Sequence, residues 1–204
     1  MVNLMPRTVL GFAILMLVLA LVLFLSAGSL AFWQAWIYLG VFAVCTILIT
    51  AYLIKNDPKL LAGRVKAGPV AETQRSQKII QSLASLSLIG LFVLPGLDFR
   101  CHWSTVPPVL SLISDGLVAI GFFIVFLVFR ENTYSSAIIQ VSNDQKVITT
   151  GPYSVVRHPM HAGAAVLLIF IPLALGSWVA IPFSLPLILV VVARLREEEK
   201  PPVT

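Results

Sequence analysis

The chain has 204 residues, of which 58% are hydrophobic and only 11% are charged. This composition, with a mean hydropathy of +0.96, excludes an ordinary soluble globular domain and indicates an integral membrane protein. The formal net charge of +5 does not indicate nucleic-acid binding. The cations lie in short segments between apolar stretches, where they report orientation in a membrane.

Six apolar stretches of about twenty residues follow one another, the length that a helix needs to cross the hydrocarbon core. They cover residues 9–27, 32–54, 79–97, 108–129, 159–175 and 178–193. The first is long for a signal peptide, so we interpret it as a retained anchor. Alternation typical of strands is rare. The sequence therefore predicts an all-α, polytopic transmembrane bundle in a single domain, residues 1–204, that ends in a helical hairpin over residues 158–199.

The positive charges are distributed unequally between the two sides of this bundle. If the N-terminus lies in the cytosol, Arg100 is the only one of the 14 Lys and Arg residues on the opposite side. Cytoplasmic loops carry an excess of Lys and Arg, so we expect both termini in the cytosol.

Two polar features interrupt the apolar pattern. Residues 56–64 begin with Asn56, Asp57 and Pro58, a combination typical of a helix start, and form either an interfacial helix or a plain surface loop. Asp115 lies within the fourth stretch, near the two prolines at its outer end, and we expect it at the membrane interface.

The rest of the sequence shows few motifs of a specific binding site. Cys45 and Cys101 have neither the number nor the spacing of a disulfide framework or a metal site, and no glycine-rich phosphate loop is present. Residues 131–157 leave the membrane, and residues 142–144 are a plausible hairpin turn. This segment could form a flap over a cytosolic site.

The most informative segment is Gly151 to Met160. Pro159 suits the first turn of a helix, because its missing N–H is one that would be unpaired anyway. The chain then reverses at Gly176, and its two arms, of about 27 and 33 Å at 1.5 Å per residue, return to a similar depth. Arg157 and His158 should therefore lie beside the acidic pair Glu198 and Glu199.

A cation pair, a helix N-terminus and a carboxylate pair together match an amino-acid-like zwitterion. The same residues are also consistent with a snorkelling anchor beside the membrane and a solvated helix end. Spacing alone does not separate these two interpretations.

These residues resemble the isoprenylcysteine carboxyl methyltransferase and phospholipid methyltransferase family of membrane enzymes, particularly its bacterial members. The resemblance rests on Gly-Pro-Tyr at 151–153, Arg-His-Pro-Met at 157–160, the apolar hairpin and the two glutamates. Weaker similarity extends through residues 130–136 and 57–61. Such a family implies an inner-membrane protein of a bacterium.

The resemblance implies S-adenosylmethionine as methyl donor and a lipophilic acceptor, a carboxylate, amine or thiol, taken from the bilayer. It implies candidate catalytic residues Asn132, near the acceptor, and Arg157. It further implies a cofactor pocket made by Tyr153, Arg157, His158, Pro159, His161, Glu198 and Glu199. No metal is required. The oligomeric state stays open.

Two departures from the family pattern keep alternatives open. His161 stands where the family usually has tyrosine, and family members usually continue well beyond the glutamates, whereas this sequence ends at Thr204. A sterol-reductase-like enzyme that uses NADPH is one alternative. The other is a non-catalytic membrane protein that has kept the helical scaffold.

Overall fold

The computed structural model describes residues 4–66, 75–131 and 150–198, with side chains at 5–62, 85–131 and 150–192. Throughout these residues the regular structure is helical, which confirms the predicted all-α bundle. The predicted turn at residues 142–144 lies outside them. In chain order the elements are α1 Leu4–Ala27, α2 Trp33–Asn56, α3 Pro58–Lys66, α4 Arg75–Cys101, α5 Pro108–Glu131, η1 Gly151–Ser154, α6 Pro159–Ala174, η2 Ile181–Phe183 and α7 Ser184–Glu198.

Each of the six predicted apolar stretches overlaps one of the long helices, α1, α2, α4, α5, α6 or α7. Within the described residues, α1, α2 and α5 are long and apolar enough to cross a membrane. The helices α6 and α7 are also apolar but shorter, with 16 and 15 residues. The number of crossings stays a prediction.

The last helix begins later than the sequence indicated. We expected its span from residue 178, but α7 starts at Ser184 and is preceded by the single 3-10 turn η2. Two causes act together. Pro182 has no N–H to continue an α-helical ladder, and hydrogen bonds hold residues 177 and 178 against the end of α4.

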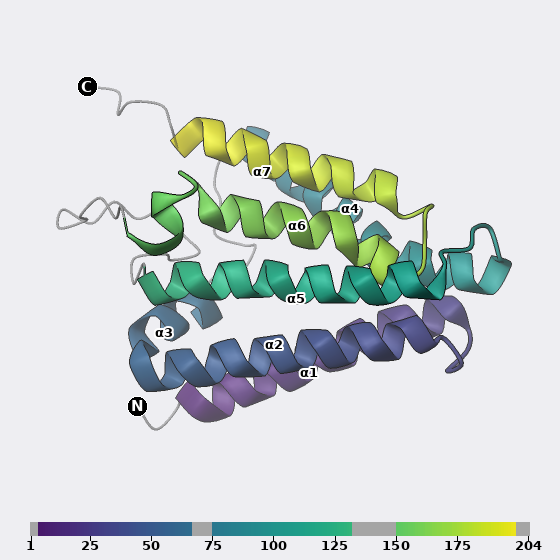
Figure 1. Cartoon of the computed structure of the whole chain (residues 1–204), viewed down its shortest axis with the longest axis horizontal. Coiled ribbons are helices and arrows are strands. Elements are labelled where there is room, and N and C mark those ends of the chain that lie inside the picture. Colours follow the sequence, from purple (N-terminus) through teal and green to yellow (C-terminus); the bar gives the residue numbers. More distant parts are fainter. Residues whose placement is uncertain (1–3, 67–74, 132–149, 199–204) are drawn as a thin grey trace.

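The helices run along one common direction, so the bundle has two distinct ends (Figure 1). At the motif end lie the start of α1, the α2–α3 junction, the end of α5, η1, the start of α6 and the end of α7. At the far end lie the three reversals of residues 28–32, 102–107 and 175–183. Arg7, Lys55, Lys59, Arg130 and Arg157 belong to the motif-end segments, and Arg100 ends α4 at the far end. Five of these six described cations thus lie at the motif end, and their orientation relative to a membrane stays a prediction.

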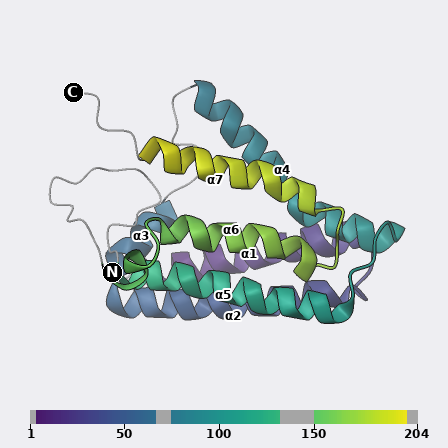
Figure 2. The same ribbon diagram turned by 45° about the horizontal axis from the view of Figure 1, so that its top comes forward.

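Two pairs of helices approach closely because glycines line their contacts. A Cβ on Gly163 of α6 would lie 3.2 Å from the carbonyl oxygen of Gly121 on α5, and one on Gly96 of α4 would meet the backbone of α1. Figure 2 shows α5 and α6 side by side, while the first half of α4 diverges from the bundle. Small residues that bring backbones together are typical of helix packing in membranes.

At the far end, a buried carboxylate links α4 to the two loops that follow α4 and α6. Asp98 of α4 is only 1% exposed. It accepts hydrogen bonds from the backbone N–H and the hydroxyl of Ser104 and from the hydroxyl of Ser177. Trp178 in turn donates its backbone N–H to Ser104 Oγ over 3.1 Å. These bonds fasten the α6–α7 reversal to α4.

The short helix α3 closes part of the motif end. Asp57 caps it, accepting a hydrogen bond from the N–H of Leu60 at 2.9 Å, and Pro58 is its first residue. Of the two interpretations that the sequence left open for residues 56–64, the structure shows the helix. The buried Leu60 and Leu61 pack with Leu53 and Phe129 and with the partly buried Met160 of α6. The beginning of α6 therefore packs, through Met160, against a small apolar cluster at the motif end.

Candidate functional site

The segment before α6 is held against the end of α5. Gly151 has φ +59°, a conformation that favours glycine, and a Cβ there would lie 2.6 Å from Cγ of Glu131. Thr150 donates its hydroxyl to Glu131 Oε2 at 3.2 Å, and Glu131 also pairs with Arg130 at 3.4 Å. The close approach fixes where η1 begins and hence where its half-buried Tyr153 lies.

The start of α6 agrees with the sequence prediction. His158 occupies the N-cap position, and the fully buried Pro159 is the first helical residue. The rings of His158 and His161 meet edge to face with centroids 5.7 Å apart, one helical turn along α6. Both side chains are half-buried. A helix N-terminus and two imidazoles therefore share one small region of the motif end.

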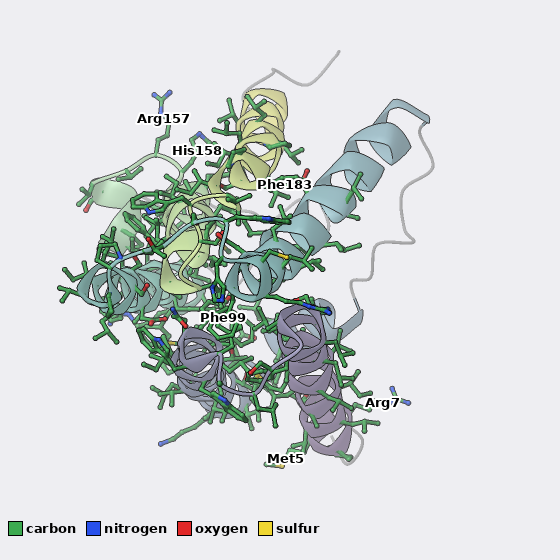
Figure 3. All side chains as sticks on the ribbon, turned by 90° about the vertical axis from the view of Figure 1, so that its right-hand side faces the viewer. Met5, Arg7, Phe99, Arg157, His158 and Phe183 are labelled. Atoms are coloured by element: carbon green, nitrogen blue, oxygen red, sulfur yellow. The ribbon has the colours of Figure 1, made fainter. Side chains whose placement is uncertain are left out.

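Arg157 is exposed and projects outward from the bundle beside His158, on the side opposite Arg7 (Figure 3). Within the described residues no carboxylate pairs with its guanidinium. The group lies next to the positive end of the α6 dipole, a setting that favours an anionic ligand.

The acidic side of the predicted site is described at the backbone only. The end of α7, at Glu198, and the start of α6 lie at the same end of the bundle (Figures 1 and 2). The Glu198 side chain, Glu199 and Asn132 fall outside the described side chains and residues. Tyr153, Arg157, His158, Pro159 and His161 therefore lie on η1 and at the start of α6, where His158 and His161 are in contact and Arg157 points away from the bundle. A shared pocket and the contacts of the glutamates stay predictions.

The elements that make this region are α5, η1, α6 and α7, which all lie in the last half of the chain. The phospholipid methyltransferase family model matches residues 110–204. The match confirms the resemblance that the motif predicted and supports a membrane methyltransferase. No curated protein and no solved structure matches the chain.

Sequence reasoning missed how this phospholipid methyltransferase-like segment is anchored. Glu131 and Thr150 are separated by 19 positions, and no local pattern indicates that they meet. The only available signal was Gly151 before a proline, which suggests a special backbone conformation but does not name a partner.

Two other expectations concern polar residues away from the motif. Asp115 is only 4% exposed and lies inside the bundle, where α5 packs against α2. Its expected depth at the membrane interface stays a prediction. Cys45 and Cys101 are both free thiols. Among the described residues no group of His, Cys, Asp and Glu could hold a metal ion.

Proposed function

We propose that the protein is an S-adenosylmethionine-dependent methyltransferase that methylates a carboxylate, amine or thiol of a lipophilic acceptor drawn from the bilayer. The observation that carries the proposal is that the family match over residues 110–204 includes the Arg157–Pro159 helix start. In this proposal the motif end faces the cytosol of a bacterial inner membrane, in keeping with the cations gathered there.

The described residues fit the amino-acid part of such a cofactor. Its carboxylate would accept hydrogen bonds from Arg157 and from the N-terminus of α6, which offer a charge and free N–H groups in one region. Its ammonium and ribose hydroxyls would bind Glu198 and Glu199 at the end of α7. Tyr153 and His161 would form the walls between these two polar groups.

When bound, the cofactor supplies a methyl group already activated by its sulfonium charge. The chain then has to orient the acceptor and exclude water, because alignment alone accounts for much of the rate in such a transfer. His158 and Pro159 fix the floor of the pocket through the helix start, and Asn132 is the candidate that positions the acceptor. The apolar surface of the bundle leaves the acceptor free to arrive from the lipid.

Equilibrium binding of labelled S-adenosylmethionine and of NADPH to the detergent-purified protein tests the proposal. We expect S-adenosylmethionine to bind, and Arg157→Ala and Glu198→Ala each to weaken binding by about 1.5–3 kcal/mol, the range for a charge-assisted hydrogen bond. The matched control is Arg7→Ala, which removes an exposed cation at the same end but on α1. Binding of NADPH instead would identify a reductase.

The acceptor is identified separately. Membranes that contain the protein are incubated with methyl-labelled S-adenosylmethionine, and the labelled lipid or peptide fraction is analysed by mass spectrometry. We expect a labelled lipophilic product that disappears in Arg157→Ala. A correctly folded protein that binds neither cofactor would favour a non-catalytic role.

A further inference from the structure

The interface between α2 and α5 contains polar atoms that the methyltransferase proposal does not use. Five buried side-chain oxygens have no hydrogen-bond partner within the described part of the chain: Gln34 Oε1, Tyr38 Oη, Ser111 Oγ and both carboxylate oxygens of Asp115. Tyr38 and Ser111 are completely buried, and Asp115 is 4% exposed. Burying so many polar groups without partners is costly, so each such group calls for an explanation.

The four residues that carry these oxygens lie near the starts of α2 and α5. Gln34 and Tyr38 are one turn apart near the start of α2, and Ser111 and Asp115 are one turn apart near the start of α5. Both helices begin at the far end and pack against each other (Figure 1). Asp115 interacts electrostatically with Tyr38, which places the carboxylate and the phenol in one region.

The charge of this region is negative when Asp115 is ionised. Asp115 supplies a carboxylate, and the C-terminal end of α6 adjoins it, since a Cβ on Gly176 would lie 2.9 Å from Gln34 Nε2. A helix C-terminus carries partial negative charge. Of the described basic residues, Arg100 belongs to this end, but its side chain is exposed and lies against the turn at Gly28. No described cationic side chain therefore balances Asp115.

We infer that Gln34, Tyr38, Ser111 and Asp115 form a binding site for a monovalent cation the size of Na⁺. Oxygen-only ligands favour hard cations. A single carboxylate and one monovalent cation make a neutral pair, whereas a divalent ion would leave a net charge in the apolar interior. The ion would bridge α2 and α5 and satisfy oxygens that no described neighbour reaches.

Thermal unfolding of the purified full chain tests the site through the fluorescence of its four tryptophans. The salts are NaCl, KCl and N-methyl-D-glucamine chloride at constant ionic strength. A ligand that binds only the folded state stabilises it in proportion to its occupancy. We expect Tm to rise with Na⁺ concentration and to saturate, with a response to K⁺ that requires several-fold higher concentration.

Variants locate the effect. Asp115→Asn should lose the Na⁺ response, and the milder Ser111→Ala should weaken the apparent affinity for Na⁺ several-fold while it still folds. Asp98→Asn is the matched control, because it alters a buried carboxylate that serine donors already satisfy, and it should keep the response. Equal Tm values in Na⁺ and N-methyl-D-glucamine would overturn the site. An unchanged Na⁺ response in both variants would also overturn it. A Tm that depends on pH but not on Na⁺ would overturn it as well, because it would indicate that Asp115 binds a proton instead.

Discussion

Replacing Asp98 by alanine should loosen the attachment of the α6–α7 reversal to α4. The substitution removes the acceptor of three hydrogen bonds, two from Ser104 and one from Ser177. Ser177 is fully buried, so losing the hydrogen bond from its hydroxyl to the Asp98 carboxylate should cost about 2–3 kcal/mol. Ser104 is half-buried and partly recovers its bonds from water, at about 0.5–1.5 kcal/mol each.

We therefore expect Asp98→Ala to lower the free energy of unfolding by about 3–6 kcal/mol, and Ser177→Ala to lower it by about 1.5–3 kcal/mol. Both values are measured by titrating the protein in dodecyl maltoside with sodium dodecyl sulfate while following circular dichroism. Ser114→Ala is the matched control. Ser114 is equally buried, but its hydroxyl bonds only to the carbonyl of Leu110 in its own helix, and we expect a loss below about 1 kcal/mol.

The double variant decides whether the two residues act through each other. Because Asp98 and Ser177 share one hydrogen bond, their effects should not add, and the coupling energy should be about 1–2 kcal/mol. A coupling energy near zero would refute the reasoning, since it would mean that the bond contributes nothing to holding the reversal in place.

Three further predictions concern the motif end and its supports. Gly163→Ala should cost about 1–3 kcal/mol in the same titration, because the added Cβ meets an α5 side chain at 3.0 Å, whereas Gly116→Ala, with open space around it, should cost nothing. Gly151→Ala should destabilise by about 1–2 kcal/mol and weaken S-adenosylmethionine binding, because φ +59° is unfavourable for alanine; unchanged affinity would separate this turn from the pocket. His161→Tyr should leave methyl transfer unchanged or increase it, and a large loss in the labelling assay would show that the chain has adapted to histidine.

Local signals in the sequence predicted most of the helices. The apolar stretches located the long helices because a membrane-spanning segment must be continuously apolar. Pro159 marked the start of α6, because proline suits the first position of a helix. These features depend on neighbouring residues alone.

Contacts between distant residues were not predictable in this way. The bond between Asp98 and Ser177 joins residues 79 positions apart, and it displaced the start of α7 from its expected place. The burial of Asp115 was not predictable either, because one sequence shows that a residue is polar but not which helix it faces. For the candidate site, sequence reasoning proposed Arg157 and His158, and their role stays a prediction. It did not anticipate the contact with Glu131 that positions the segment before them.

The close approach of α5 and α6 has a mechanical consequence. With glycines at 121 and 163 the two backbones are nearly in contact, so neither helix can slide or tilt without the other. The pair should move as one rigid body along the length of the bundle, with the Arg157–Pro159 segment at its motif end. Bending of the surrounding membrane would then move the Arg157–Pro159 segment together with both helices and leave the distances between them unchanged.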